Sequence, residues 1–377
     1  MPLDLLDHLD LLESLEYLDH LAPLKSLLEN NLPIWIICCN FALVFVNMDT
    51  LQQIRKPVES AFREYETLFD DSLRSSNPLL QQVLTYVSAK RGKQLRPLLV
   101  LLAAKMCNSI TDKTLRTAVA LELLHTASLM HDDVVDASPT RRGMESVNHH
   151  WNNKVAVLGG DYMLSKTISL IADIRNSRIL EIVSMLGRSL ASGELLQLHA
   201  NETMWITEEK YYQVIEQKTA KLFEACMEAG AESAGCTMRQ RNALKEYGRL
   251  FGLCFQIKDD IFDYSDSEEL GKPTMSDIQD GKVTLPLIIS LQRAPQEEST
   301  HIRFLAEALS NHDEHVNIGK AEQEIKSFVM CYQGVQYANN QMYALKKKAA
   351  EQLSVFRDSA TKESLLLLFD YAINRLH

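Results

Sequence analysis

From Met48 onward, apolar residues recur at intervals of three and four along almost the whole chain. This spacing places apolar side chains on one face of an α-helix, whereas a half-buried strand requires strict alternation. Glycine (14) and proline (10) are both sparse in the 377 residues, which disfavours an all-β fold rich in turns. The sequence therefore predicts three or four helices between 298 and 377, and earlier helices over 79–87, 95–106, 115–136, 153–174, 178–200, 208–234, 238–264 and 283–293.

The chain divides into a short leading segment and one long helical region. No Pro/Gly linker, repeat or low-complexity stretch splits residues 48–377, so we expect a single all-α domain there. Residues 1–47 begin acidic and leucine-rich and end in an apolar run, which is short for a membrane span of about 20 residues. Three interpretations stay open: a partner-binding or membrane-touching helix, a one-pass anchor, or an extension foreign to the natural protein. The last predicts full activity for a truncation starting at Met48.

Charge and cysteine content narrow the function classes. The formal net charge is −11 and no basic stretch stands out, so nucleic acid is not a predicted partner. The seven cysteines are scattered and contain no C-x-x-C pair. This pattern is typical of reduced, mostly buried thiols in a cytoplasmic protein.

The first acidic motif is Asp132-Asp133-Val134-Val135-Asp136, which ends an apolar helical run. Asp132 and Asp136 are four residues apart and therefore lie one above the other on one helix face. Two carboxylates at the C-terminal end of a helix repel each other and oppose its dipole, so a bound cation would stabilise them. Carboxylate oxygens with room for water suit Mg²⁺. Alone, such a cluster is more often a solvated helix face.

A second motif with the same spacing is Asp259-Asp260-Ile261-Phe262-Asp263, and it also ends a largely apolar helical run. Asp259 and Asp263 again share a face. Two copies in matching contexts argue against chance. We therefore predict two acidic walls that face each other across a cavity, with Mg²⁺ and a diphosphate between them.

Basic and polar residues that could complete a diphosphate site occur near both motifs. Arg141 and Arg142 follow the first motif and could bind phosphate oxygens bidentately. Lys93 and Arg96 flank a helix start, where anions are favoured, and His125 lies two turns before Asp132. Each residue alone has a simpler explanation as a solvated or core side chain, so the inference rests on their joint presence. The further candidates are Lys218, Thr219, Gln256, Lys272 and Lys282.

These motifs together resemble the trans-isoprenyl diphosphate synthases, the polyprenyl synthetase family, over about residues 50–377. The likeness rests on Gly-Lys-x-x-Arg-Pro at 92–97, Asp-Asp-x-x-Asp followed by Arg-Arg, Lys-Thr at 218–219, and Gln-x-x-Asp-Asp-x-x-Asp at 256–263. The segment from Gly271 to Leu287 strengthens it. One departure is Gln94, where many members carry another basic residue. The resemblance implies one large helical domain around a central hydrophobic cavity.

The resemblance also implies roles for the motif residues. Asp132 and Asp136, assisted by Asp133, would hold Mg²⁺ on the allylic diphosphate, and Asp259 and Asp263, with Asp260 beside them, would hold another from the opposite wall. Isopentenyl diphosphate would bind to Lys93, Arg96, His125 and Arg142. The allylic diphosphate would be steadied by Arg141, Lys218 and Lys272, with Lys282 near the closing loop, and Thr219 and Gln256 would lie near the ionising carbon.

The length of the product is predicted from the residues one turn before the first motif. Ala127 and Ser128 are both small, so they leave a path open for a growing chain, whereas a bulky aromatic there would block it. We expect a long product with octaprenyl as the central value, and a shorter one after replacement of Ala127 by Tyr or Phe. The alternative is that both residues only permit close helix packing.

Other activities on a similar fold are weighed against this one. The nearest alternative is a short-chain member that makes geranylgeranyl diphosphate. A head-to-head condensing enzyme or terpene cyclase would not need the isopentenyl residues Lys93, Arg96 and His125, and an inactive subunit would have lost an aspartate motif. By resemblance, we also expect a cytoplasmic homodimer that supplies a quinone side chain and touches the membrane peripherally.

Overall fold

The computed structural model of the chain describes residues 50–89, 91–265 and 275–375. The predicted leading segment and the candidate residue Lys272 lie outside these ranges. Residues 50–55 are helical and lead into the 3₁₀ turn η3 (Lys56–Val58). The further elements are α4 (Glu59–Ser72), α5 (Pro78–Ala89), α6 (Leu95–Cys107), α7 (Asp112–Val135), β1 (Thr140–Arg141), β2 (Met144–Glu145), α8 (Val147–His150), α9 (Asn153–Ile174), α10 (Ser177–Thr203), α11 (Glu208–Ile215), the π-helical turn η4 (Glu216–Ala220), α12 (Lys221–Ser233), α13 (Met238–Phe262), α15 (Ser276–Gln279), α16 (Leu285–Arg293), α17 (Gln296–Ser310), α18 (Ile318–Cys331), α19 (Gly334–Gln352), the 3₁₀ turn η5 (Leu353–Val355) and α20 (Ala360–Asn374).

The prediction of an all-α fold is confirmed, and each predicted helical range is helical in the structure. The boundaries differ by a few residues, as expected for helix ends. One range differs in kind, because 208–234 is divided into α11, a π-helical turn and α12. The predicted tail contains four α-helices, α17 to α20. The only strands among the described residues form a two-residue antiparallel hairpin, β1–β2, just after the first aspartate motif.

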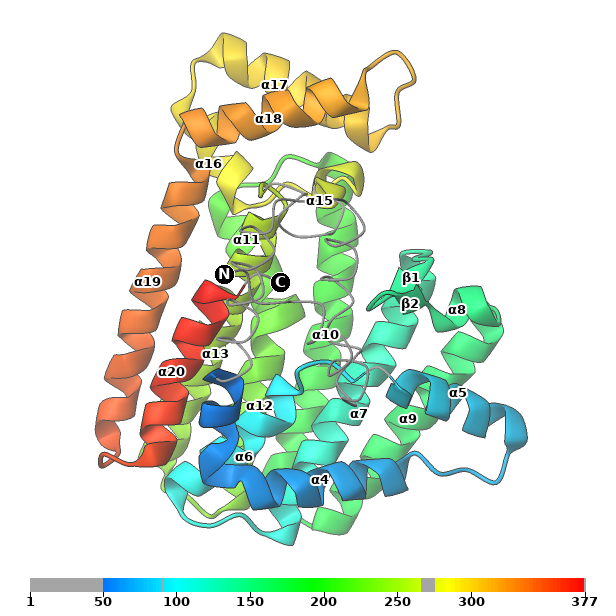
Figure 1. Cartoon of the computed structure of the whole chain (residues 1–377), viewed down its shortest axis with the longest axis vertical. Helices are drawn as coiled ribbons and strands as arrows, with labels where there is room; N and C mark the ends of the chain where they lie inside the picture. Colours follow the sequence, from blue (N-terminus) through cyan, green and yellow to red (C-terminus); the bar gives the residue numbers. More distant parts are fainter. Residues whose placement is uncertain (1–49, 90, 266–274, 376–377) are drawn as a thin grey trace, which may run out of the picture.

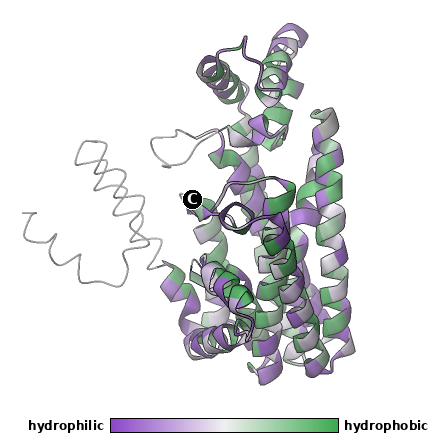
Figure 2. Cartoon of the chain, turned by 90° about the vertical axis from the view of Figure 1, so that its right-hand side faces the viewer, coloured by the Kyte–Doolittle hydropathy of each residue, from purple (hydrophilic) through white to green (hydrophobic). Residues whose placement is uncertain are grey.

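The long helices run roughly along the longest axis of the molecule, and shorter elements cover the ends (Figure 1). The helices α17 and α18 lie across one end, and α4 crosses near the other. Figure 2, from the side, again places the α17–α18 pair at one end and shows hydrophobic residues distributed along the helices. The helix α12 packs against both α7 and α13, so the two aspartate motifs end helices that share one neighbour (Figure 1).

The centre of the bundle is held together by helices that are apolar on most sides. In α6 the run from Leu98 to Ala104 is entirely buried, and in α7 the same is true from Thr117 to His125. Helices of this kind belong in the core of a large domain. A full apolar side chain in such a position contributes about 1.5–3 kcal/mol to folding when it leaves water.

Two glycines bring α13 close to α12. A Cβ on Gly248 would lie 2.6 Å from the carbonyl oxygen of Phe223, and one on Gly252 would lie 2.5 Å from the Cα of Ala220. Any larger residue would push the two helices apart. The glycines therefore set the distance across which side chains of α13 can reach the π-helical turn η4.

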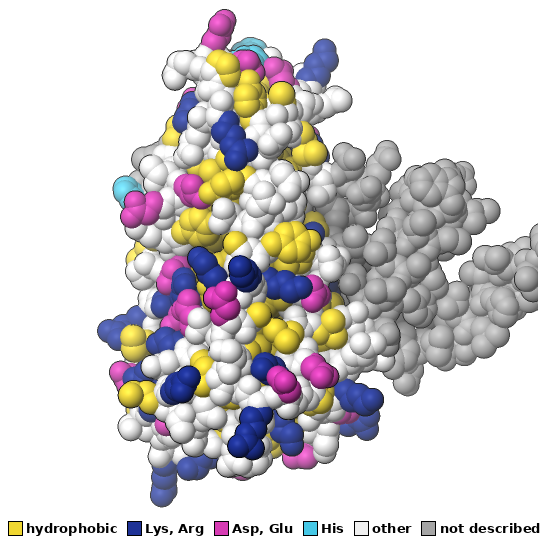
Figure 3. Space-filling model, turned by 90° about the vertical axis from the view of Figure 1, so that its left-hand side faces the viewer, with side chains coloured by type: hydrophobic (Ala, Val, Ile, Leu, Met, Phe, Trp, Pro, Cys, Tyr) yellow, Lys and Arg dark blue, Asp and Glu magenta, His cyan; other side chains and the backbone are white. Residues whose placement is uncertain are grey.

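The outer surface is mixed in character. Figure 3 shows the face on the left-hand side of Figure 1, where basic, acidic and hydrophobic side chains are interspersed. Among the described residues, α9 is the one helix whose length and composition would allow it to cross a membrane. Its most apolar window is 39% buried within the fold, and the helix packs closely against α7.

Candidate active site

The first aspartate motif is the end of α7, and two of its carboxyl groups are available to a ligand. Burial raises the pKa of Asp132 to about 6, with the charges of Glu194 and Asp136 adding to the shift and Lys218 opposing it. Asp136 is the C-cap residue of α7 and its side chain is exposed. Among the described residues, neither side chain accepts a hydrogen bond. This pair of repelling carboxyls is the arrangement that a divalent cation stabilises.

The middle residue of the first motif points elsewhere. Asp133 is buried, and its Oδ1 accepts hydrogen bonds from Nε of Arg141, at 2.8 Å, and from Nη2 of the same side chain. Burial raises the pKa of Asp133, and the bond from Arg141 opposes this shift. The structure thus pairs Arg141 with the motif itself. Asp133 orients the loop that follows α7, whereas Asp132 and Asp136 remain open.

The hairpin β1–β2 places Arg142 at its tip. Arg142 (φ 52°) and Gly143 (φ 73°) are both left-handed, as a two-residue type I′ turn requires. For a non-glycine residue this conformation costs about 1–2 kcal/mol, which the hairpin must compensate. The guanidinium of Arg142 lies over Gly92, where an added Cβ would be 3.1 Å from Cζ. Glycine at 92 therefore makes room for the predicted phosphate-binding arginine.

The predicted isopentenyl-binding residues are brought together at the start of α6 and the middle of α7. Burial lowers the pKa of Arg96, whose guanidinium lies 5.4 Å from the ring centre of Phe223. Burial also lowers the pKa of His125 well below its usual range, and the charges of Arg96 and Arg142 act in the same direction. The histidine is therefore neutral between two cations. The ammonium of Lys93 lies 5.6 Å from the ring of Tyr371 on α20.

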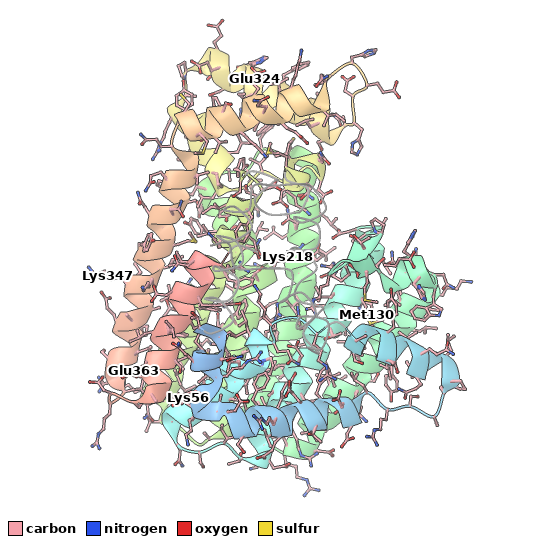
Figure 4. The ribbon with its side chains drawn as sticks, in the orientation of Figure 1. Lys56, Met130, Lys218, Glu324, Lys347 and Glu363 are labelled. Atoms are coloured by element: carbon pink, nitrogen blue, oxygen red, sulfur yellow. The ribbon has the colours of Figure 1, made fainter. Side chains whose placement is uncertain are left out.

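The Lys-Thr pair lies in the π-helical turn η4 between α11 and α12. Such turns are frequent at functional sites because the extra residue turns side chains away from the regular helix positions. Nζ of Lys218 lies 2.9 Å from Oε2 of Glu194 on α10, and Figure 4 shows Lys218 in the middle of the molecule. The lysine is thus held near Asp132, where its positive charge opposes the rise of the aspartate's pKa.

A chain of hydrogen bonds connects η4 to the second aspartate motif. Oγ1 of Thr219 donates to Oε1 of Gln256 at 2.7 Å, and Nε2 of Gln256 donates to Oδ1 of Asp260 at 2.9 Å. The hydroxyl of Tyr211 donates to the other oxygen of Asp260. Burial raises the pKa of Asp260. Asp260 is therefore fully engaged inside the protein.

The outer residues of the second motif also have protein partners. Nη2 of Arg375 lies 2.6 Å from Oδ1 of Asp259, and the same guanidinium is 3.7 Å from the ring centre of Phe255. Asp263 accepts backbone hydrogen bonds from Ser276 (3.0 Å) and Asp277 (3.1 Å), at the start of α15. The expectation that Asp259 and Asp263 hold a metal stays a prediction, and in the structure both carboxyls have protein partners. Asp263 caps α15, and Asp259, with 42% of its side chain exposed, is the more accessible.

Two lysines connect the acidic walls electrostatically. Lys282 is bonded to Asp280 at 2.9 Å, and the charges of Asp277 and of Asp136 across the site both raise its pKa. The pKa of buried Asp277 is raised by burial, and Lys282 and Lys218 are among the charges that affect it. The ends of α7 and α13 therefore lie close enough for their charges to interact, with Lys218 and Lys282 between them.

Two open cavities lie beside α7 and α13. One, of about 630 Å³ including open solvent, is lined by six of the polar residues discussed above: Lys218, Thr219, Gln256, Asp260, Asp277 and Lys282. The other, of about 780 Å³ on the same measure, is lined by Arg91, Gln94, Glu122, Asp133, Arg141 and Arg142 over an apolar floor that includes Met130. The first cavity thus contains Lys218 and Lys282 of the predicted allylic-side residues, and the second contains Arg141 and, of the predicted isopentenyl-side residues, Arg142.

The residues predicted to set chain length differ in accessibility. Ala127 is completely buried in the apolar core, whereas Ser128 is half-buried and its hydroxyl donates to the carbonyl of His125 at 2.9 Å. Of the two, only Ser128 has exposed surface, and the influence of either residue on chain length stays a prediction.

Several site residues were not predicted from the sequence. Glu194, Tyr211 and Arg375 approach the motifs from other parts of the chain, Glu122 lies on α7 before the first motif, and no motif marks any of them. Asp277 belongs to the segment that strengthened the family resemblance, which was a usable signal. Within the described ranges, no three His, Cys, Asp or Glu side chains converge on one point where all could hold a metal. A cation here would therefore need substrate phosphates as further ligands.

The fold and site define a class: an all-α enzyme with two acidic helix ends and basic groups suited to diphosphates. Comparison with known proteins gives the family. The family model for polyprenyl synthetase matches residues 77–323. An all-trans-nonaprenyl-diphosphate synthase (geranyl-diphosphate specific) of Rhodobacter capsulatus is 34% identical over 87% of this chain and 99% of its own.

Solved structures agree. A polyprenyl synthase from Caulobacter crescentus, complexed with calcium and isoprenyl diphosphate, superposes with a TM-score of 0.79 at 30% identity, over 87% of this chain and 98% of its own. A geranylgeranyl pyrophosphate synthase from Bacteroides thetaiotaomicron gives 0.73 at 36% identity, over 87% of this chain and all of its own. The chain belongs to the polyprenyl synthetase family and is a trans-prenyl diphosphate synthase, a prenyltransferase.

Proposed function

We propose that the protein condenses an allylic diphosphate, farnesyl or geranylgeranyl, with successive isopentenyl diphosphates to give a long all-trans product, with octaprenyl diphosphate as the central expectation. The observation that carries the proposal is the position of Lys218, held by Glu194 between Asp132 and the second motif. This arrangement provides a place for one diphosphate between two acidic helix ends. The separate basic cluster of Arg96, His125 and Arg142 provides a place for the second.

The side chains divide the reaction between them. Lys218 and Lys282 would hold the allylic diphosphate, and their charges would stabilise the negative charge that develops on it as its C–O bond breaks. The carbonyl oxygen of Gln256 and the hydroxyl of Thr219 would face the allylic cation with their dipoles. Arg96 and Arg142 would bind the diphosphate of the second substrate and direct its double bond toward the cation. After the new C–C bond forms, the resulting cation would lose one proton to the released diphosphate, which leaves the double bond of the lengthened product.

A divalent cation fits the first motif. Asp132 and Asp136 have carboxylate oxygens that no hydrogen bond from a described residue occupies, and burial together with the charges of Glu194 and Asp136 raises the pKa of Asp132. Asp259 is the accessible carboxyl of the opposite wall. Mg²⁺ suits such oxygen ligands when substrate phosphates complete its shell. When bound, the cation would offset charge on the leaving diphosphate.

A long product is proposed because small side chains precede the first motif. Ser128 is half-buried beside the site, so a growing chain can pass it. A short-chain, geranylgeranyl-type product is the second candidate, favoured by the complete burial of Ala127. Ser128→Phe is expected to shorten the product, whereas Ala127→Phe should mainly overpack the core, at a cost of about 1–3 kcal/mol.

A homodimer is proposed from an exposed apolar surface. Seven large hydrophobic side chains of α9 and α10 are exposed: Val157, Leu158, Ile168, Leu180, Met185, Leu195 and Leu198. A surface of this kind on two neighbouring helices suits a second copy related by a two-fold axis. Light scattering should give the mass of two chains, and Leu195→Glu should shift it toward one. We place the protein in the cytoplasm, with peripheral membrane contact where its apolar product is released for a quinone side chain.

The deciding experiment is incubation with farnesyl diphosphate, labelled isopentenyl diphosphate and Mg²⁺. Mass analysis of the dephosphorylated product gives both activity and chain length. A series of products longer by five carbons each supports the proposal. A cyclised product, or release of diphosphate without incorporation of label, would contradict it.

A further inference from the structure

Glu122 is a carboxyl group placed inside the basic cluster. It lies on α7, is 6% exposed, and lines the same cavity as Arg91 and Arg142. Burial lowers the pKa of both Arg96 and Arg142, and in each case Glu122 is the charge that most strongly opposes the shift. Glu122 is therefore the main counter-charge of both Arg96 and Arg142, and it lines the same cavity as Arg142.

The contact differs from an ordinary buried ion pair. Oε2 of Glu122 is buried and has no hydrogen-bond partner, and the same is true of Nε of Arg96. Glu228 on α12 is equally buried but lies 2.6 Å from Arg178 and 3.0 Å from Lys245. Buried carboxyls are normally paired in this second way, because an unpaired one is costly. The oxygen of Glu122 that lacks a hydrogen bond points to a role other than structural pairing.

The chemistry of repeated condensation gives the basic cluster a particular problem. This step of the argument rests on the proposed function. When the new C–C bond forms, the allylic diphosphate leaves, and the diphosphate of the isopentenyl unit stays attached to the product. The product therefore remains bound through the basic cluster. Before the next round, its diphosphate must move to the aspartate side and free the cluster for another isopentenyl diphosphate.

We propose that Glu122 is a positioning residue that weakens the hold of Arg96 and Arg142 on the bound diphosphate and so speeds this transfer. Its negative charge opposes that of the ligand through the same low-dielectric interior that strengthens the arginines. It also offsets the charge repulsion between Arg96 and Arg142 while the site is empty. Glu122 would thus lower the affinity of the basic cluster for the bound diphosphate and raise the rate at which the next condensation begins.

Glu122→Gln removes the charge and keeps the shape. We expect the KM for isopentenyl diphosphate to fall about fivefold and the KM for the allylic substrate to stay unchanged. In single-turnover mixtures with excess enzyme, the first condensation should keep its rate within about twofold. Later rounds should slow about tenfold, so intermediates one and two units long accumulate. Glu122→Asp, which keeps the charge, should elongate like the unmodified enzyme.

Glu228→Gln is the matched control, because it removes a buried carboxyl of the same length whose partners lie outside the site. It should lower thermal stability and leave the ratio of first-round to later-round rates unchanged. If Glu122→Gln folds poorly, Glu122→Met removes the same negative charge with an apolar side chain of similar length. Equal slowing of first and later rounds, a raised KM for isopentenyl diphosphate, or unchanged elongation would each overturn the inference. An inactive unmodified enzyme would overturn the proposed function as well, so the two failures are distinguishable.

Discussion

The two Asp-Asp-x-x-Asp motifs have the same spacing and each ends a largely apolar helix, yet their carboxyl groups have different surroundings. At the end of α7, Asp132 and Asp136 accept no hydrogen bond from a described residue. At the end of α13, Asp260 and Asp263 are bonded to Gln256, Tyr211 and the start of α15. The same spacing thus gives one motif whose outer carboxyl groups accept no hydrogen bond from the described part of the chain (the open wall, Asp132 and Asp136) and one whose carboxyl groups are already bonded within the protein (the second wall, Asp259, Asp260 and Asp263). The difference teaches that spacing predicts which residues share a face, and the rest of the fold decides which of them can bind a ligand.

The largest effect is expected at the open wall. Asp132→Asn should lower kcat/KM about 10²–10³-fold, because it removes a carboxylate that would hold the divalent cation offsetting the charge on the leaving diphosphate. Asp263→Asn is the matched control at the other wall, since an amide oxygen can still accept hydrogen bonds from Ser276 and Asp277. Steady-state kinetics should show a much smaller loss for the control. Equal losses would remove the distinction between the two walls.

A smaller effect, on stability, is expected from Arg375 at the second wall. Arg375→Ala removes the contact with Phe255 and the hydrogen bond to its carbonyl at 2.9 Å, and it leaves Asp259 without this partner. We expect a loss of about 2 kcal/mol in the free energy of unfolding, typical of a charged hydrogen bond with packing. Urea denaturation measures it. Arg375→Lys should recover only part of the lost stability, because a lysine ammonium cannot stack on the ring of Phe255 as the planar guanidinium does.

The pH dependence of metal binding should report the open wall. The pKa of Asp132 is about 6, raised above its ordinary value of 3.8. A raised carboxyl pKa contributes stability that is present below the ordinary value and is lost as pH rises through about 6. Ionised Asp132 is also the form that binds metal. Mg²⁺ should therefore raise the melting temperature more at about pH 8 than at about pH 5, with affinity falling up to about tenfold per unit below pH 6.

In Asp132→Asn, this pH dependence should largely disappear. A titration of melting temperature against Mg²⁺ at several pH values tests both proteins. If the unmodified enzyme responds to Mg²⁺ equally at both pH values, Asp132 is not the group that competes with protons for the metal.

The smallest effect is expected from the link between the π-helical turn and the second motif. Thr219→Val removes the hydroxyl that donates to Gln256 at 2.7 Å and keeps a similar volume. We expect a loss of about 1 kcal/mol in stability and a decrease in kcat of severalfold, because Gln256 loses its orientation. Thr126→Val on α7 is a control, since that hydroxyl bonds only to its own helix at Glu122. Calorimetry and kinetics on both variants decide whether the link matters.

Much of the fold was predictable because helix periodicity is local information. The positions of α7 and α13, and hence of both motifs, follow from runs of apolar residues that the sequence displays directly. The π-helical turn was not predictable, because a single extra residue leaves the apolar spacing almost unchanged. The burial of Ala127 was equally hidden, since it depends on which helices pack over α7.

The side chains that bond to the aspartates also could not be predicted from the sequence. Arg375 reaches Asp259 from the last helix, and Glu194 reaches Lys218 from α10. Such contacts join segments far apart in the chain and carry no local pattern. The spacing placed Asp263 on one face with Asp259 and the resemblance implied a metal-binding role, but neither indicated that the following segment folds back so that α15 begins at its carboxyl. The four-residue spacing determined the helix face on which Asp263 lies, and tertiary packing determined that its carboxyl bonds to the start of α15.

The most direct test of the central claim is the binding of a non-ionising allylic diphosphate, farnesyl thiolodiphosphate, measured by calorimetry with and without Mg²⁺. If Asp132, Asp136 and Asp259 join the diphosphate through a divalent cation, Mg²⁺ should tighten binding at least about tenfold in the unmodified enzyme. It should change the affinity of Asp132→Asn little. Equal binding with and without Mg²⁺ in the unmodified enzyme would contradict the account.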